Sequence, residues 1–265
     1  MRTKIIAIAN NKGGVGKTTT ALTVGLELAR RGRRVLLVDL DGQCSLTENL
    51  IDFTPQRNIR DALTGPKTKA LLESCIVPGT QFVSQTWTAD LLPSCEAMKD
   101  IESELASKTA REMLLLKVFR ALDASRRWDV VIIDCPPSLG IVTKNALTAC
   151  DELYVPTTPD YSAVDGLGKL ARTCEELAED LNPGLEISGI VITRFDRRAN
   201  LHKAAETALR QMYGDIVFNT RIRQNVSVSE SPHSYQDIIL YAPRSKGAND
   251  YKELTDEIEA RLDLG

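Results

Sequence analysis

Short apolar runs alternate with segments of helical spacing along most of this chain. The first run, residues 3–10 (TKIIAIAN), is almost continuously apolar and ends in a glycine-rich turn. Residues 17–31 then place apolar side chains on one face of a helix, which Gly32 ends. A second apolar run, residues 34–39, follows at once. This order predicts a strand, a turn, a helix and a second strand.

The alternation returns in the second half of the chain. It predicts strands at 129–134, 152–155 and 187–193, and helices at 112–124, 138–150, 160–181, 201–213 and 247–264. In the fourth of these helices, Ser162 and Asp165 have the spacing of a capping box. Continuous apolar strands between helices are typical of α/β proteins whose sheet is covered on both faces. We therefore predict a doubly wound, mostly parallel sheet.

Residues 50–107 do not follow this rhythm. Residues 58–63 have the spacing of a short helix, and residues 82–93 could hold two short strands. The segment predicts an insertion within a single domain that spans residues 1–265. That length is sufficient for one large α/β domain with its own core.

Composition excludes several classes of protein. The chain is 43% hydrophobic and 26% charged with a net charge of −3, which is ordinary for a globular protein and excludes a polycation. None of its six cysteines forms a C-x-x-C pair, so a zinc site has no support and a reducing compartment is favoured. Apolar runs too short for a signal peptide or a membrane span favour a cytoplasmic protein.

The first turn carries the clearest chemistry. Residues 10–19 read NNKGGVGKTT, between a predicted strand and a predicted helix. Glycines let main-chain N–H groups close on phosphate oxygens, while a lysine and a hydroxyl serve the β/γ-phosphates and Mg²⁺. Gly16, Lys17 and Thr18 supply these groups. The common form G-x-x-x-x-G-K-[ST] requires a glycine at position 11, where this chain has Asn11. The loop also carries a second lysine, Lys12, which the common form does not require.

KGGVGKTT resembles the deviant Walker A motif of the ParA/MinD family, and the resemblance extends over most of the chain. VLLVDLDGQ (35–43) is similar to the second family motif, and WDVVIIDCPPSLG (128–140) to its Walker B segment. Residues 223–254 are similar to the C-terminal segment of ParA proteins. The resemblance implies a P-loop NTPase fold with ATP and Mg²⁺ as cofactors, and it is closest to Soj-like ParA partition ATPases.

The resemblance also implies roles for the residues of the loop. Lys17 neutralises the β/γ-phosphates and Thr18 holds Mg²⁺. Lys12 is the signature lysine, which reaches the phosphates of a second subunit, so that ATP stabilises a homodimer. The residues expected to contact the nucleotide are Lys12, Gly13, Gly14, Val15, Gly16, Lys17, Thr18, Thr19 and Asp39.

Three aspartates at predicted strand ends complete the expected catalytic set. Asp39 and Asp41 are two residues apart, which would point both to one face. By resemblance, Asp41 positions the attacking water and Asp39 supports Mg²⁺. Asp134 ends the strand VVIID beside the P-loop, where a carboxylate normally belongs to the Mg²⁺ shell. Gly42 stands where the family usually has proline.

The family contacts adenine through two segments. One follows the strand that ends at Thr193, and the other has the form I-P-x-N, here residues 222–225. Arg194, Arg223 and Asn225 are the candidates, since an arginine plane can stack on a base.

Residues 194–223 hold seven basic residues and three acidic ones. A local basic surface on an acidic protein suits phosphate binding, although charge alone fits a solvated helical face equally well. The resemblance favours nonspecific DNA, because ParA proteins place basic residues here. The candidates are Arg197, Arg198, Lys203 and Arg221, while Ser227 replaces a second usual basic position.

Membrane binding of the MinD type requires a basic amphipathic helix at the C-terminus. Residues 250–263 instead hold six acidic and two basic residues, which anionic lipid would repel. We therefore expect no membrane insertion. The resemblance implies a weak, Mg²⁺-dependent ATPase that dimerises on ATP and binds nonspecific DNA on the nucleoid. It also implies that a ParB-like partner stimulates the ATPase. The alternative is a positioning ATPase for a non-DNA cargo or a membrane-associated system.

Overall fold

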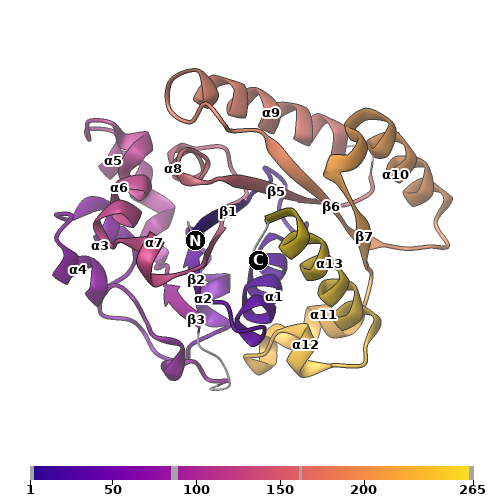
Figure 1. Cartoon of the computed structure of the whole chain (residues 1–265), viewed down its shortest axis with the longest axis horizontal. Helices are drawn as coiled ribbons and strands as arrows, with labels where there is room; N and C mark the ends of the chain where they lie inside the picture. The colour runs from indigo at the N-terminus through magenta and orange to yellow at the C-terminus, as the bar shows by residue number, and fades with distance from the viewer. Residues whose placement is uncertain (1–2, 85–88, 161–162, 263–265) are drawn as a thin grey trace.

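The computed structural model describes residues 3–84, 89–160 and 163–262 (Figure 1). Within them, one seven-stranded sheet has the order β3-β2-β4-β1-β5-β6-β7, and every neighbouring pair is parallel. The strands are β1 (Lys4–Ile8), β2 (Val35–Asp39), β3 (Ala89–Leu92), β4 (Val130–Asp134), β5 (Glu152–Thr157), β6 (Ile187–Phe195) and β7 (Val217–Arg223). The predicted doubly wound, parallel α/β fold is confirmed.

Helices cover both faces of this sheet, as Figure 1 shows. One face packs against α1 (Lys17–Arg30), α2 (Ser45–Glu48), α12 (Ile238–Tyr241) and α13 (Lys246–Leu262). The other packs against α3 (Ile59–Thr64), α4 (Lys69–Ser74), α5 (Ile101–Leu105), α6 (Leu114–Ala121), α8 (Ile141–Ala149), α9 (Ala163–Asp180) and α10 (Asn200–Tyr213). Two short helices, α7 (Ala124–Arg127) and α11 (Val226–Glu230), complete these layers.

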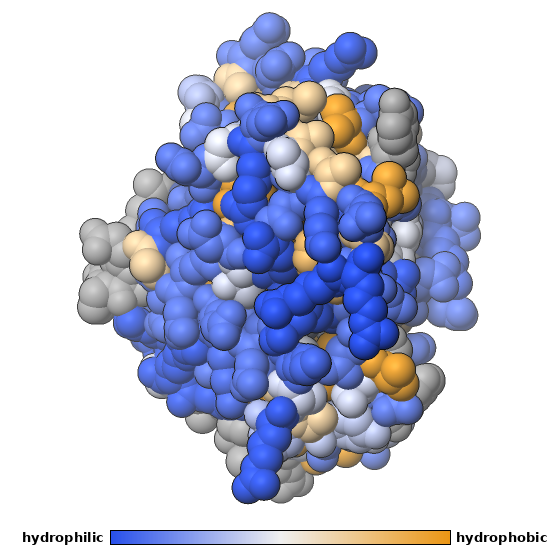
Figure 2. All heavy atoms as spheres, turned by 90° about the vertical axis from the view of Figure 1, so that its right-hand side faces the viewer, coloured by the Kyte–Doolittle hydropathy of each residue, from blue (hydrophilic) through white to orange (hydrophobic). Residues whose placement is uncertain are grey.

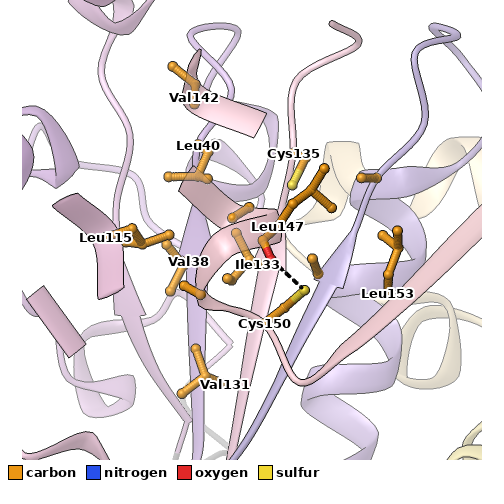
Figure 3. Close-up of a cluster of buried hydrophobic side chains, with 14 of the residues drawn as sticks. Val38, Leu40, Leu115, Val131, Ile133, Cys135, Val142, Leu147, Cys150 and Leu153 are labelled. Atoms are coloured by element: carbon orange, nitrogen blue, oxygen red, sulfur yellow. Dashed lines mark hydrogen bonds between the residues drawn. The ribbon is translucent and has the colours of Figure 1, made fainter. Parts of the chain in front are cut away.

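Two of the central strands are buried at every position, which explains their continuous apolar runs. All five residues of β2 and of β4 are buried. On one face, Val38, Val131 and Ile133 pack with side chains from α6 and α8 (Figure 3). Cys150 lies in the same core, with its Sγ 3.5 Å from the Leu147 carbonyl oxygen. Five of the six cysteines are buried in this way and act as small hydrophobic residues.

Residues 50–107 contribute to this sheet rather than standing apart from it. Their strand β3 pairs with β2 at one edge, and buried side chains of α3 and α5 join the core. The helix predicted at 58–63 is confirmed, and Asn58 caps it through a capping box with Asp61. Only one of the two strands expected in 82–93 is found in the described residues. Residues 82–84 pair with no neighbouring strand, since the Val83 amide donates to the Leu50 carbonyl instead. That the segment is an insertion remains a prediction.

Several other elements differ from expectation. The sequence patterns did not indicate β7, α11 or α12. The helix expected at 112–124 ends at Ala121, because Asp123 has a left-handed backbone (φ 52°) that separates α6 from α7. The predicted capping box at Ser162 and the end of the last helix at 263–264 lie outside the described residues. No helix in the described ranges combines the length and apolar character that a membrane span requires.

Candidate active site

A cavity of about 890 Å³ opens at the carboxyl edge of the sheet. Loops that follow β1, β2, β6 and β7 form its walls, and ligands of open α/β sheets bind at this edge. Of the residues predicted to bind or hydrolyse the nucleotide, its walls hold Gly13, Gly14, Gly16, Lys17, Thr18, Thr19, Asp41, Arg194, Arg223 and Asn225. The chain thus brings both groups, the P-loop and the adenine candidates, to one cavity.

The P-loop owes its shape to glycine. Gly14 and Gly16 have φ angles of 72° and 88°, a left-handed backbone that side chains with a Cβ rarely adopt. Gly16 caps α1, so the first main-chain N–H groups of that helix face the cavity without helical partners. Val15 is buried, and its carbonyl accepts a hydrogen bond of 2.8 Å from the Thr193 hydroxyl. The loop is therefore shaped to hold an anion and is anchored to β6.

Lys17 projects from the first turn of α1 and is only 7% exposed. Its ammonium donates to the main-chain carbonyl of Lys12 at 3.0 Å, which closes the loop on itself. Burial lowers the pKa of Lys17, while the nearby Asp134 charge acts in the opposite direction. A phosphate in the loop would supply the negative charge that this buried cation needs.

The ammonium of Lys12 is bound by side chains that follow β5. It forms an ion pair with Asp160 and a hydrogen bond of 3.3 Å to the Thr158 hydroxyl. The side chain lines a second, smaller cavity of about 330 Å³ beside Asp165 and Lys169. To contact phosphates of a second subunit, the ammonium would have to leave Asp160.

Asp39 and Asp134 end adjacent strands in register, and both are fully buried. Asp39 accepts three hydrogen bonds: 2.9 Å from the Thr47 amide, 2.7 Å from the Thr47 hydroxyl and 3.0 Å from the Asp41 amide. Burial raises the pKa of Asp39 to about 6, although the bonds from Thr47 oppose this. Asp39 therefore holds the main chain of the loop that carries Asp41. Asp41 lines the cavity, whereas Asp39 does not.

Asp134 has a different environment. Within the described residues, neither carboxylate oxygen has a hydrogen-bond partner of normal geometry. Its pKa is raised well above the usual value, first by burial and then by the Asp39 charge, while Thr18 and Lys17 lower it. An orphaned buried carboxylate beside a threonine hydroxyl fits a divalent cation. Thr18 and Asp134 could hold Mg²⁺, which would neutralise phosphate charge when bound.

No group of three or more His, Cys, Asp or Glu side chains forms a complete metal site in the described part of the chain.

Asp41 lies in the loop after β2, half-buried in the cavity wall. One of its carboxylate oxygens accepts a 2.9 Å hydrogen bond from the Gln43 amide. The rest of the carboxylate is available to the cavity, where it could orient a water molecule.

The three adenine candidates differ in how far other residues of the chain already bind their side chains. Arg194 is exposed and has a left-handed backbone (φ 52°), an uncommon conformation that often marks a functional position. Arg223 pairs with Asp250, and its Nε lies 2.9 Å from both carboxylate oxygens. Asn225 caps α11 by accepting a 3.0 Å bond from the Ser227 amide. Arg194 is therefore the less constrained of the two arginines and the one that an adenine ring would contact more easily.

Sequence reasoning missed the partners of the signature lysine. Thr158 and Asp160 directly follow β5, so their place at a strand end was the signal that could have found them. It also missed Tyr251 of α13, which lines the cavity and whose hydroxyl lies 3.3 Å from that of Thr20. No local pattern announces a contact between residues 231 positions apart.

The variant Asp134→Asn is expected to flatten the pH dependence of stability in chelator-treated protein. Raised pKa values mean that the folded state binds more protons than the unfolded chain, so stability falls as pH rises from about 4 through 6 and beyond. Asparagine removes one charge and keeps the size and shape of the side chain. The melting temperature above pH 7 should rise by about 2–4 °C for each kcal/mol of burial cost and charge repulsion removed.

Asp129→Asn is the matched control, because it lies at the other end of the same strand and Arg34 lowers its pKa. Loss of that pair should reduce stability above pH 4, the opposite sign. Superimposable melting profiles for wild type and Asp134→Asn between pH 4 and 8 would contradict the assigned electrostatics.

Comparison with known proteins places this site in a family. The model of a family described as AAA domain matches residues 3–187. The chromosome partitioning protein ParA of Caulobacter vibrioides is 37% identical over 262 residues, which cover 97% of this chain and 94% of that protein. The chromosome-partitioning ATPase Soj of Thermus thermophilus is 38% identical over 264 residues, with coverage of 99% and 98%.

A solved structure agrees in fold. Cobyrinic acid a,c-diamide synthase from Mycobacterium smegmatis with bound ATP analog and magnesium superimposes with a TM-score of 0.81 and 31% identity, covering 99% of this chain and 97% of that one. Identity of this extent over nearly the whole chain shows that the protein belongs to the ParA/MinD family of P-loop proteins.

Proposed function

We propose that this protein is a ParA-like partition ATPase, which dimerises on Mg²⁺–ATP, binds DNA without reading its sequence and is stimulated by a ParB-like partner. The observation that carries the proposal is one cavity lined by the P-loop glycines, Lys17, Thr18 and the half-buried Asp41. The buried Asp134, whose carboxylate has no hydrogen-bond partner of normal geometry in the described residues, ends the adjacent strand β4. Relatives named chromosome-partitioning proteins support the biological role.

Hydrolysis would follow from the division of labour around this cavity. The P-loop N–H groups and Lys17 bind the phosphates, and Thr18 with Asp134 holds Mg²⁺. Asp41 orients the attacking water from the cavity wall. Phosphoryl transfer requires mainly positioning and charge stabilisation, and these residues supply both. A weak basal rate is expected until a partner protein improves this arrangement.

Dimerisation would depend on Lys12. In this structure its ammonium is bound by Asp160 at the rim of the P-loop. Phosphates of ATP in a second subunit would compete with Asp160 for that cation. ATP therefore favours the dimer, and loss of the γ-phosphate weakens it.

The DNA-binding proposal rests on four exposed basic residues at the end of β6, in the turn that follows it and in the first turn of α10. Arg194, Arg197, Arg198 and Lys203 are exposed. The other three basic residues of 194–223 are occupied by acidic partners: Arg210 and Arg221 by Glu206, and Arg223 by Asp250. Arg221 would therefore support the surface from within rather than act as a free phosphate contact.

The face that carries α10 and α13 is mostly hydrophilic, with hydrophobic residues in small separate groups (Figure 2). Such a surface suits phosphate contact through exposed cations better than apolar docking. The turn itself is ordered, since the Arg198 amide donates to the Asp196 carboxylate at 2.9 Å and the Asp196 amide to His202 Nδ1 at 3.0 Å. We infer a nucleoid-associated, cytoplasmic protein from this surface.

Retention on DNA beads tests the proposal. With Mg²⁺–ATP the protein should be retained on DNA of any sequence, and without nucleotide it should pass through. Absence of retention under both conditions would favour the alternative, a positioning ATPase for a non-DNA cargo.

Arg198→Ala is expected to lower the affinity for nonspecific DNA and to reduce the slope of log K against log salt by about 0.9, the value for one phosphate contact. Equilibrium binding to a labelled duplex between 50 and 200 mM salt measures this. Arg210→Ala is the control, because Glu206 and the main-chain carbonyl oxygen of Phe218 already occupy that guanidinium. An unchanged slope for Arg198→Ala would remove this residue from the interface.

A further inference from the structure

The loop that carries Asp41 is clamped by a segment far away in sequence. Ser94 follows the edge strand β3, and its hydroxyl donates a 2.8 Å hydrogen bond to the main-chain carbonyl of Asp41. The Ser94 amide donates to the Thr47 hydroxyl at 2.9 Å. Ser94 and Thr47 are only 4% and 6% exposed. Two buried polar groups therefore connect the β3 edge to the catalytic loop.

These bonds close into a ring that begins and ends on Asp41. The Asp41 amide donates to Asp39, which also accepts the Thr47 hydroxyl. Thr47 accepts the Ser94 amide, and the Ser94 hydroxyl returns to the Asp41 carbonyl. Both peptide groups of Asp41 are thereby fixed, while its carboxylate lines the cavity. A closed network of this kind restricts a residue more than any single bond in it.

Gly42 gives a second, independent sign of the clamp. A Cβ at this position would lie 2.7 Å from the main-chain nitrogen of Lys99 and 3.2 Å from its Cα. The turn at residues 96–100 therefore presses directly on the loop beside Asp41. Backbone cannot give way as a flexible side-chain end could, so this contact leaves the loop little freedom to move outward.

We propose that Ser94 is a positioning residue for ATP hydrolysis, which sets the place of Asp41 through the main chain and makes residues 94–100 part of the hydrolytic machinery. This inference rests on the proposed role of Asp41 as the residue that orients the attacking water. Ser94 itself does not line the nucleotide cavity. Its loss should therefore affect turnover and leave nucleotide binding in place.

Ser94→Ala is expected to lower kcat about 10-fold with little change in ATP affinity, because a displacement of about 1 Å at a reacting group can cost up to about 100-fold. Ser94→Thr keeps the hydroxyl and should restore most of the turnover. Gly42→Ala keeps every hydrogen-bonding group of the ring but forces the Asp41 loop away from the turn at residues 96–100, and should lower kcat likewise. Ser84→Ala, which loses a comparable 2.7 Å hydroxyl bond to the Tyr235 carbonyl, is the matched control and should resemble wild type.

The measurements are steady-state ATP turnover, affinity for a fluorescent ATP analogue and melting temperature, on the full chain. A wild-type kcat in Ser94→Ala would overturn the proposal. So would a loss of ATP affinity as large as the loss of turnover, found to the same extent in Ser94→Ala and in Ser94→Thr. In the background Asp41→Ala, removal of Ser94 should cause no further loss of turnover.

Asp41→Ala alone separates this inference from the proposed function. If Asp41→Ala retains wild-type turnover, the proposed role of Asp41 fails, and the positioning role of Ser94 fails with it. If Asp41→Ala is inactive and Ser94→Ala turns over at the wild-type rate, only the inference about Ser94 fails.

Discussion

Lys17→Ala is expected to abolish ATP binding at concentrations that saturate the wild type. The ammonium is buried at the start of α1 and lines the nucleotide cavity, where it would contact the β/γ-phosphates. Each charge-assisted hydrogen bond contributes about 1.5–3 kcal/mol, so loss of two should weaken binding by at least about 100-fold. Titration with a fluorescent ATP analogue measures the change.

Lys169→Ala serves as the control, since this lysine lines the smaller cavity and not the nucleotide cavity. It should bind ATP like wild type. The melting temperature of Lys17→Ala should not fall below that of wild type by more than a few degrees, because burial already disfavours the charged lysine. Wild-type ATP affinity in Lys17→Ala would contradict the P-loop assignment.

Asp41→Ala and Lys12→Ala should both lose turnover, by about 100-fold or more, yet for different reasons. Asp41→Ala loses the group that orients the attacking water, while the P-loop N–H groups, Lys17 and the Mg²⁺ ligands remain. Lys12→Ala loses a contact to the phosphates of a second subunit. Both variants should still bind the fluorescent ATP analogue, and phosphate release measures their loss of turnover.

Asp160→Ala is the matched control for Lys12, because it removes the partner of the ammonium and keeps the ammonium itself. It should retain dimerisation on ATP. If it lost dimerisation as completely as Lys12→Ala, the pair with Asp160 would be part of the interface rather than a competitor of the phosphates.

Local pattern was sufficient for the strands that carry the P-loop and its carboxylates. β1, β2 and β4 are buried on both faces, so their apolar runs are continuous and end where the site begins. The glycines and Lys17 follow directly in sequence. The fold and the phosphate end of the site were therefore predictable from short segments.

Long-range pairing was not predictable in the same way. β7 lies at the edge of the sheet and has both buried and exposed positions. Its arginines are typical of a surface segment, so the sequence pattern did not indicate a strand. Arg221 is bound to Glu206, and Arg223 to Asp250, 27 residues away. Lys12 is bound to Asp160, 148 residues away. Such ion pairs depend on how elements pack, which residue spacing does not encode.

The role of residues 50–107 was hidden for the same reason. Their short elements follow no simple period, yet β3 completes the sheet beside β2 and brings Ser94 to Asp41. These two residues are 53 positions apart, and no local pattern in the sequence indicates their contact.

The mass of the ATP-bound state tests the central claim most directly, that ATP joins two subunits through Lys12 and that Asp41 ends this state by hydrolysis. Light scattering on Asp41→Ala and Lys12→Ala with Mg²⁺–ATP provides the comparison. We expect a dimer for Asp41→Ala, which accumulates because it cannot hydrolyse ATP, and a monomer for Lys12→Ala. Two monomers, or two dimers, would contradict the account.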